Sequence, residues 1–216
     1  MRRENDLSLC LVTDSRLAGE RGLEAIVAAA VEGGCTMVQL REKEADTRTF
    51  LRRAEAMKRV LAGTGVPLLI NDRVDIALAV DADGVHLGQS DMPAAVARQL
   101  LGENKIIGLS VENTAQALAA NDEPIDYIGI SPVFGTPTKP DIAPPLGAEG
   151  TRAVVALCRY PAIGIGGINR QTVTEAMSYG LTGIAVVSDI MTDAHPKEAA
   201  RALRAAVEAS LKQQKQ

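Results

Sequence analysis

Short runs of apolar residues recur along the whole chain, separated by longer segments in which apolar residues return every three or four positions. Most of the short runs are continuously apolar and do not alternate with polar residues. This is typical of strands that are buried on both faces of a parallel sheet. The pattern predicts eight strands, at residues 8–13, 36–40, 67–70, 84–87, 105–109, 127–130, 162–165 and 183–187.

The longer segments have the period of helices, and some of them stop at glycine. Residues 23–32 end at Gly33 and Gly34, and residues 47–61 end near Gly63. Further helices are predicted at residues 74–80, 94–101, 114–120, 148–158, 170–178 and 196–213. Each predicted strand is therefore followed by a helix.

Eight strand-helix units in 216 residues, about 27 residues each, predict an α/β protein with a single (β/α)8 TIM barrel. No linker and no change in composition divides the chain, so one catalytic domain over residues 1–216 is expected. An open doubly wound sheet is the alternative, but the number of strands favours the barrel. Because barrel enzymes carry their chemistry at the carboxyl ends of the strands, the residues after each apolar run are the candidates for a site.

Composition and charge narrow the possible partners. The net charge is −4 and the 23 Lys and Arg residues are scattered, so we expect small-molecule ligands and no nucleic acid. No apolar run approaches the ~18 residues of a membrane span. Arg2 and Arg3 are followed by Glu4, Asn5 and Asp6 and not by the apolar stretch of a signal peptide, so we expect no membrane partner and no processing. The three cysteines are far apart, which fits the cytoplasm. A homo-oligomer is compatible with the sequence.

Polar residues follow several neighbouring predicted strands. The stretch QLREK places Gln39 at the end of the second strand and Arg41 and Lys43 directly after it. Asn71 follows the third strand, and Ser110 follows the fifth. Cations after a strand commonly belong to a solvated loop. Here the polar groups share one predicted rim, and the sequence therefore predicts a site for an anionic ligand.

Two aspartates follow the third and fourth predicted strands. These strands are neighbours, so the carboxylates of Asp72 and Asp91 could converge on one hard cation. Mg²⁺ suits oxygen ligands and keeps waters and phosphate oxygens in its shell. Aspartates near turns also commonly cap helices, and the pattern alone leaves both interpretations open.

The later strands are followed by a glycine pair and a long loop. Gly166 and Gly167 are predicted to open a helix, whose exposed N–H groups favour a phosphate, with a tight turn as the alternative. Residues 131–147 contain five of the ten prolines and no helical pattern. A loop of this length in a compact domain is typical of a lid.

The two histidines, His86 and His195, have different settings. His195 precedes a proline and is expected on the surface at a helix start. His86 points into the barrel or toward the rim, and a core histidine with a satisfied hydrogen bond is favoured. No Ser/His/Asp, Cys/His or Walker-type arrangement is present, so the sequence predicts no histidine-centred acid-base chemistry.

Taken together, these stretches resemble the thiamine phosphate synthase family, whose members join the pyrimidine and thiazole halves of thiamine phosphate. The resemblance spans nearly the whole chain. It rests on six blocks in order: VQLREK (38–43), LLINDRVDIALAVDADGVHLGQSDMP (68–93), IIGLS (106–110), DYIGISPVFGTPTKPDIAPPLG (126–147), IGIGGI (163–168) and GIAVVSDI (183–190). One block alone would be a weak signal, whereas six in order are highly specific.

The resemblance implies a role for each polar group at the predicted rim. For the diphosphate of hydroxymethylpyrimidine diphosphate it implies Gln39, Arg41, Lys43, Asn71, Ser110 and Lys139. For the thiazole phosphate substrate it implies Thr136, Thr138, Gly167, Val187 and Ser188. Asp72 and Asp91 match the ligands of one Mg²⁺. The chain shows no departure from the family pattern at these positions.

The resemblance also implies the reaction. Pyrophosphate leaves the CH₂ carbon, the aminopyrimidine ring delocalises the resulting cation, and the thiazole nitrogen captures it without a general base. Three alternatives remain: a thiazole tautomerase of the same superfamily, a non-catalytic thiamine-precursor binding protein, and another phosphate-binding barrel enzyme. The 136–139 loop with Asp72 and Asp91 favours the synthase, since a tautomerase has no diphosphate to ionise.

Overall fold

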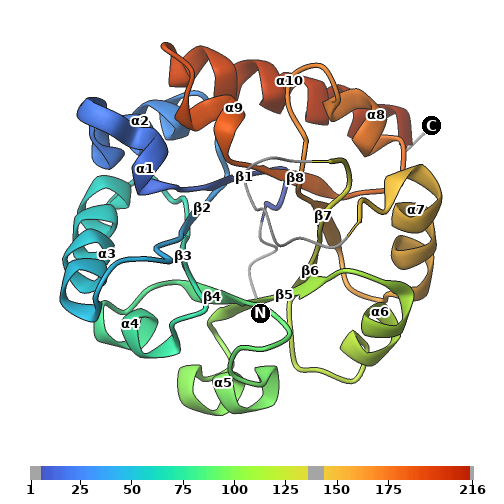
Figure 1. The fold of residues 1–216 in the computed structure, drawn as a ribbon, viewed down its shortest axis with the longest axis horizontal. Coiled ribbons are helices and arrows are strands. Elements are labelled where there is room, and N and C mark those ends of the chain that lie inside the picture. The colour runs from blue at the N-terminus through green and yellow to red at the C-terminus, as the bar shows by residue number, and fades with distance from the viewer. Residues whose placement is uncertain (1–5, 136–143, 215–216) are drawn as a thin grey trace.

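In the computed structural model, which describes residues 6–135 and 144–214, eight parallel strands close into a barrel (Figure 1). The strands are β1 (Leu9–Val12), β2 (Met37–Leu40), β3 (Leu68–Asn71), β4 (Gly84–Leu87), β5 (Ile106–Val111), β6 (Tyr127–Ile130), β7 (Ala162–Gly164) and β8 (Gly183–Val186). Each strand pairs with the next along the chain, and β8 pairs with β1. The predicted (β/α)8 barrel is confirmed. The open sheet is wrong, because the pairing of β1 with β8 leaves no free edge.

Helices surround the barrel and connect its strands (Figure 1). Those that the sequence predicts are α2 (Leu23–Glu32), α3 (Thr47–Leu61), α4 (Val74–Ala79), α5 (Ala94–Leu101), α6 (Thr114–Ala120), α7 (Gly147–Leu157), α8 (Val173–Met177) and α10 (Pro196–Gln214). The structure adds three that are too short to show a period: α1 (Ser15–Ala18), the 3₁₀ helix η1 (Gly19–Arg21) and α9 (Ser188–Met191). Within the described ranges, none of the helices has both the length and the hydropathy that a bilayer span requires.

Helix α3 illustrates how local sequence sets an element and its packing. Asp46 caps its start by accepting a hydrogen bond from the Thr49 backbone N–H at 2.9 Å. Phe50, Ala54 and Met57, spaced by four and three residues, are fully buried. This apolar stripe packs into the layer between strands and helices, so α3 returns the chain from β2 to the start of β3.

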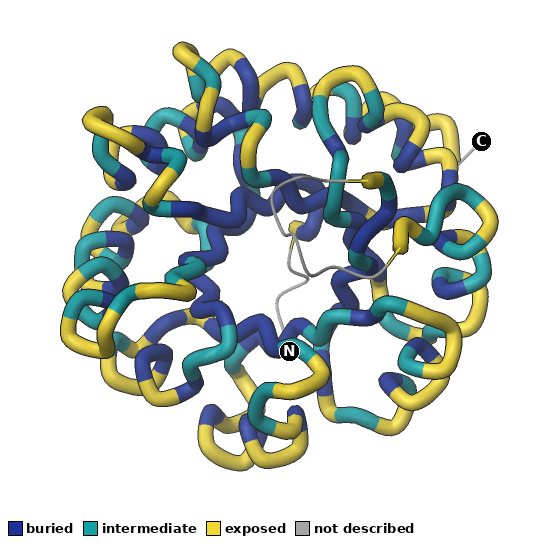
Figure 2. Tube along the Cα trace, in the orientation of Figure 1, coloured by how far each residue is buried: buried dark blue, intermediate teal, exposed yellow. Residues whose placement is uncertain are grey.

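Side chains of the strands alternate between two layers, since successive residues of a strand point to opposite faces. Figure 2 shows the buried strands inside a ring of helices whose outer sides are exposed. The layer inside the barrel includes Cys10, Met37, Leu69, Tyr127, Ile163 and Ala185. The intervening residues, such as Leu11, Val38 and Ile70, pack against the helices. Each inward row therefore leads to the rim of the barrel.

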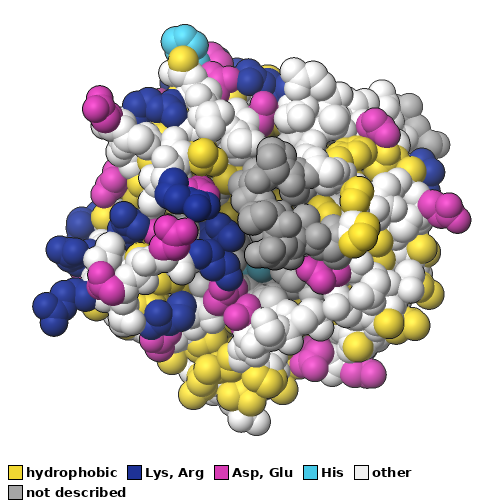
Figure 3. All heavy atoms as spheres, viewed as in Figure 1, with side chains coloured by type: hydrophobic (Ala, Val, Ile, Leu, Met, Phe, Trp, Pro, Cys, Tyr) yellow, Lys and Arg dark blue, Asp and Glu magenta, His cyan; other side chains and the backbone are white. Residues whose placement is uncertain are grey.

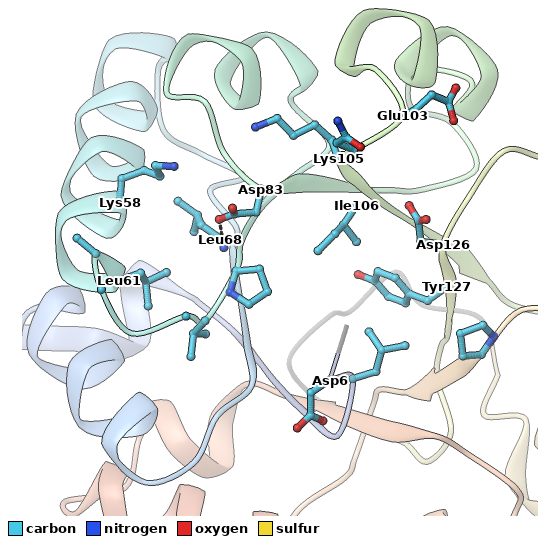
Figure 4. A pocket seen from close by; sticks show the side chains of 18 of the residues that line it. Asp6, Lys58, Leu61, Leu68, Asp83, Glu103, Lys105, Ile106, Asp126 and Tyr127 are labelled. Carbon is cyan, nitrogen blue, oxygen red and sulfur yellow. Dashed lines mark hydrogen bonds between the residues drawn. The ribbon is translucent and has the colours of Figure 1, made fainter. Parts of the chain in front are cut away.

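The amino-terminal ends of the strands surround a hollow of about 1190 Å³ (Figure 4). Carboxylates at this end hold strand backbones. Asp83 Oδ2 accepts a hydrogen bond from Leu68 N at 2.8 Å. Asp126 Oδ2 accepts from Ile107 N at 2.8 Å and from Arg98 Nη2 at 2.7 Å. These bonds give this end of the barrel a role in stability, in line with the usual division between the two faces of such barrels.

Candidate active site

Four of the predicted site residues, three of them polar, continue the inward rows at the carboxyl ends of the strands. Gln39, Asn71, Ser110 and Val187 lie an even number of residues beyond apolar members of the inner layer, so they share its side of the sheet. Gln39 and Asn71 keep only 5% and 8% of their surface exposed. The structure therefore places four of the predicted site residues on the inner side of the barrel at one rim.

Glu42 locks the loop that carries the two predicted cations. Its side chain, which is 5% exposed, forms an ion pair with Arg53 of α3 and accepts a hydrogen bond from Ser15 of α1. These contacts tie the loop after β2 to two helices. The backbone that carries Arg41 and Lys43 is thus held in place without a ligand.

Positive charge gathers around this loop. Figure 3 shows Lys and Arg side chains concentrated on the left of the molecule, over α3 and toward the opening of the barrel. Arg16, Arg41, Lys43 and Arg53 line a hollow of about 280 Å³ there, together with acidic residues. In a protein of net charge −4, this local excess favours an anionic ligand.

Lys43 and Asp72 connect the loops after β2 and β3. Lys43 Nζ lies 2.5 Å from Asp72 Oδ2. Asp72 has a φ of 63°, in the left-handed region that aspartate tolerates better than most residues, and its N–H donates to His86 O at 2.9 Å. The sharp turn at the end of β3 thereby places this carboxylate beside the lysine.

Asp91 lies beside Asp72, as the strand order predicts. Its Oδ2 accepts a hydrogen bond from Gly88 N at 2.7 Å. Burial raises the pKa of Asp91, and the adjacent Asp72 carboxylate raises it further. The cap positions of α4 and α5 are taken by Arg73 and Pro93, so the interpretation of these aspartates as helix caps is wrong. Two adjacent carboxylates instead favour a cation near both.

The oxygen ligands available at this rim suit Mg²⁺ better than a metal ion whose ligands all come from the protein. Within residues 6–135 and 144–214, no group of three or more His, Cys, Asp and Glu side chains could hold a metal ion. Asp72 and Asp91 offer two carboxylates, and Mg²⁺ commonly completes such a set with waters and phosphate oxygens. The magnesium site stays a prediction.

His86 joins the barrel interior to Ser110. Its Nε2 lies 2.9 Å from Ser110 Oγ, and its Nδ1 lies 2.8 Å from Tyr127 Oη. The interior placement of His86 is confirmed, but sequence reasoning missed its contact with a site residue. The signal available was its inward position on β4 beside Gly108 of β5. Gln89 was missed as well, and its Nε2 donates to Ser110 O at 2.6 Å.

The Gly166-Gly167 turn after β7 packs against the residues after β6. Gly167 has a φ of 65°, and a Cβ there would lie 2.6 Å from Gly135 O and 2.7 Å from Phe134 Cβ. Only glycine fits such a position. Helix α8 begins later, at Val173, so the prediction that the pair opens a helix is wrong and the tight turn is correct.

Side-chain hydrogen bonds explain why the helix starts late. Thr172 Oγ1 donates to Gly167 O at 3.0 Å and accepts from Asn169 N at 3.0 Å, which replaces a first helical turn. The helix start at this rim instead follows β8, where α9 begins at Ser188 directly after Val187. Barrels often hold a phosphate between the loops after strands seven and eight and a short extra helix.

The predicted site extends into a segment outside the described residues. Thr136, Thr138 and Lys139 lie there, with the middle of the predicted lid. The described ends of that loop are anchored, since Val133 N donates to Ile165 O at 2.9 Å and Gly147 N donates to Val133 O at 3.0 Å. The lid stays a prediction.

The fold and this rim define the class of protein. A closed parallel barrel with cations and paired carboxylates after β2 to β4, and a glycine turn after β7, is the arrangement of a barrel enzyme with an anionic small-molecule ligand. The family model described as thiamine monophosphate synthase matches residues 9–190, well over half of the chain.

Individual relatives agree with that match. The thiamine-phosphate synthase of Vibrio campbellii is 50% identical over 199 residues, covering 92% of this chain and 97% of the relative. That of Chloroflexus aurantiacus is 48% identical over 202 residues, covering 94% and 93%. The solved thiamine phosphate pyrophosphorylase of Pyrococcus furiosus has a TM-score of 0.87 at 39% identity, covering 96% and 98%. The chain therefore belongs to the thiamine-phosphate synthase family and is an enzyme of thiamine biosynthesis.

Proposed function

We propose that this enzyme condenses hydroxymethylpyrimidine diphosphate with thiazole phosphate, or its carboxylated form, and releases thiamine phosphate and pyrophosphate with the help of Mg²⁺. Membership of the family supports the reaction. The observation that carries the assignment of the site is the meeting of Lys43, Asp72 and Asp91 at one rim. A cation next to paired carboxylates suits a diphosphate that is bound together with a divalent ion.

The pyrimidine diphosphate lies, in this proposal, over the ends of β2, β3 and β5. Arg41 offers a planar fork that matches phosphate oxygens, and Lys43 offers a compact charge. Glu42 keeps the loop in place, so little ordering is needed when the ligand binds. The remaining contacts are assigned to Gln39, Asn71, Ser110 and Lys139.

Asp72 and Asp91 would hold the Mg²⁺ ion. The adjacent Asp72 carboxylate contributes to the raised pKa of Asp91, and a divalent cation relieves that repulsion. When bound, the ion supplies charge that stabilises the departing pyrophosphate. The two carboxylates and Lys43 belong to one cluster, so the charges that the leaving group needs are gathered on one side of the rim.

The thiazole phosphate is assigned to the opposite part of the rim, after β7 and β8. Support comes from the Gly167 turn, where the backbone is free of a Cβ, and from the start of α9 at Ser188. Strands β7 and β8 are neighbours through the pair Gly164 and Ile184. The remaining contacts with thiazole phosphate are assigned to Val187, Thr136 and Thr138.

The chemical step needs no proton transfer by a side chain. The bond between the CH₂ carbon and the diphosphate oxygen breaks, and its electron pair leaves with pyrophosphate. The aminopyrimidine ring delocalises the cation until the lone pair of the thiazole nitrogen forms the carbon-nitrogen bond. The protein contributes orientation of the two substrates and preorganised charge around the leaving group.

An assay with both substrates tests this proposal. We expect thiamine phosphate and pyrophosphate with Mg²⁺ and neither product with EDTA. Isomerisation of the thiazole without coupling would assign a tautomerase instead, and binding of both precursors without turnover would assign a non-catalytic protein.

A pair of aspartate variants tests the site itself. Asp72→Asn should lower turnover roughly 100-fold or more while thiazole phosphate binding, measured by calorimetry, is kept. The matched control is Asp75→Asn, because Asp75 lies nearby on α4, exposed and paired with Arg73. Equal turnover of the two variants would reject the assignment of Asp72.

A further inference from the structure

Tyr127, His86 and Ser110 form a chain of hydrogen bonds inside the barrel. Tyr127 Oη lies 2.8 Å from His86 Nδ1, and His86 Nε2 lies 2.9 Å from Ser110 Oγ. Two glycines make room for the rings. A Cβ at Gly108 would lie 2.2 Å from Tyr127 Cζ, and a Cβ at Gly129 would lie 2.9 Å from His86 Cε1. Strands β5 and β6 therefore carry glycine at the positions that the Tyr127 and His86 rings cover.

The hydrogen of the Tyr127 hydroxyl determines the direction of this chain. Tyr127 is fully buried in the inner apolar layer, and burial raises its pKa, so the phenol keeps its proton. Among the residues that the structure describes, His86 Nδ1 is the hydrogen-bond partner of Tyr127 Oη. A proton on Nδ1 would leave the phenol hydrogen buried without an acceptor, which is costly. Tyr127 therefore donates to Nδ1.

A neutral imidazole that accepts at Nδ1 carries its proton on Nε2. His86 then donates to Ser110 Oγ, and the Ser110 hydrogen is left to point to a ligand. We propose that Tyr127 and His86 are positioning residues that fix Ser110 as a hydrogen-bond donor toward an anion at the rim. This inference rests on the proposed function, in which the anion is the diphosphate.

Fixing the direction matters because a serine hydroxyl both donates and accepts. If Ser110 donated to His86 Nε2, it would present only lone pairs to the diphosphate, and the two would repel. The hydrogen bonds from Tyr127 through His86 exclude that orientation of the Ser110 hydroxyl before the ligand binds. A donor that needs no reorganisation contributes most where negative charge develops on a leaving group.

Nitrogen NMR of the imidazole side chains tests the direction. The chain has only two histidines, and His195 is exposed at the start of α10, so a His195→Gln variant assigns the signals. We expect a proton on Nε2 of His86 and none on Nδ1. The Tyr127→Phe variant should move the Nδ1 signal toward that of a nitrogen that accepts no hydrogen bond. A proton on Nδ1, or on both nitrogens, in the unsubstituted protein would overturn the inference.

Calorimetry with inorganic pyrophosphate and Mg²⁺ tests the consequence. Tyr127→Phe should weaken binding about tenfold, as Ser110→Ala does, because a hydrogen bond to a charged group is lost in both. In the double variant the two losses should not add. Tyr160→Phe is the control, since the Tyr160 hydroxyl donates to Glu123 O at 2.6 Å outside the barrel and its loss should leave the affinity unchanged. Additive losses, or unchanged affinity in Tyr127→Phe, would contradict the inference.

A second pair of variants covers the case in which Tyr127→Phe does not fold. His86→Gln keeps a side-chain N–H that can donate to Ser110, whereas His86→Leu has none. Pyrophosphate affinity should be largely kept in the first variant and lost in the second, and equal affinities would overturn the inference. If NMR and calorimetry agree with the inference but the two precursors are not coupled, the proposed reaction fails and the positioning role of His86 stands.

Discussion

Lys43 Nζ lies 2.5 Å from Asp72 Oδ2, so a cation from the loop after β2 meets a carboxylate from the loop after β3. The side chains are 48% and 21% exposed, and solvent therefore screens the pair. Such pairs contribute less than about 1 kcal/mol to stability. The contact matters because it places the Lys43 ammonium and the Asp72 carboxylate side by side at the rim of the barrel.

Lys43→Ala should therefore affect binding more than folding. We expect the free energy of unfolding in urea to fall by less than about 1 kcal/mol. Pyrophosphate affinity in the presence of Mg²⁺ should fall about tenfold. Lys197→Ala, which removes another exposed ion pair, with Glu32, is the matched control for stability. A large loss of stability with unchanged affinity would show that Lys43 serves the fold.

Asp91→Asn should stabilise the metal-free protein. The folded-state pKa of Asp91 is raised above 3.8, so the folded state holds the proton more tightly and ionisation costs stability as pH rises through that range. At neutral pH the variant should gain less than about 1 kcal/mol, because solvent screens this half-buried group. The gain should vanish as pH falls below 3.8.

Urea unfolding in EDTA and then in Mg²⁺ measures this effect. Mg²⁺ should stabilise the parent protein more than Asp91→Asn, since the variant keeps only one carboxylate at the site. The prediction fails if the variant is less stable than the parent in EDTA at neutral pH.

Glu42→Ala should loosen the loop that carries the cations. The loss of its contacts with Arg53 and Ser15 should lower stability by about 1–3 kcal/mol and raise KM for the pyrimidine diphosphate. Glu44→Ala offers a close comparison, because that side chain is 76% exposed, and should cost less than about 0.5 kcal/mol. Steady-state kinetics and urea unfolding on both variants decide the matter, and identical behaviour would argue against the locking role of Glu42.

Gly167→Ala should weaken the thiazole half of the site. Its φ of 65° is unfavourable for alanine, and its Cβ would collide with Gly135 O and Phe134 Cβ. Gly65→Ala has a similar φ of 77° but meets nothing within 4 Å, so it carries only the backbone strain of about 1 kcal/mol. We expect Gly167→Ala to be the less stable variant and the only one of the pair with a raised KM for thiazole phosphate.

Much of the fold can be predicted from the sequence because strands buried on both faces are continuously apolar. The continuous apolar runs locate all eight strands, and the spacing of Phe50, Ala54 and Met57 locates α3. The elements that escaped prediction, such as α9, span a single turn and are set by their surroundings. The late start of α8 depends on side-chain bonds of Thr172 that no periodicity displays.

The site is predictable where strand order alone brings residues together. Neighbouring strands place Asp72 beside Asp91, and both residues follow short apolar runs. The contact of His86 with Ser110 depends instead on ring orientation across β4 and β5, which the sequence does not encode locally. The role of Glu42 likewise requires knowing that α1 and α3 flank its loop.

The carboxylate of Asp126 has a consequence at the far end of β5. It anchors the backbone of Ile107, and Ser110 lies three residues further along the same strand. Since side chains alternate, a slip of one residue would turn Ser110 outward and bring Leu109 to the inside. Asp126, at the amino-terminal end of the barrel, thus helps to set the register that brings the Ser110 hydroxyl to the inner side of the opposite rim. A substitution of Asp126 that shifts β5 would displace Ser110 although the two side chains lie at opposite ends of the strand.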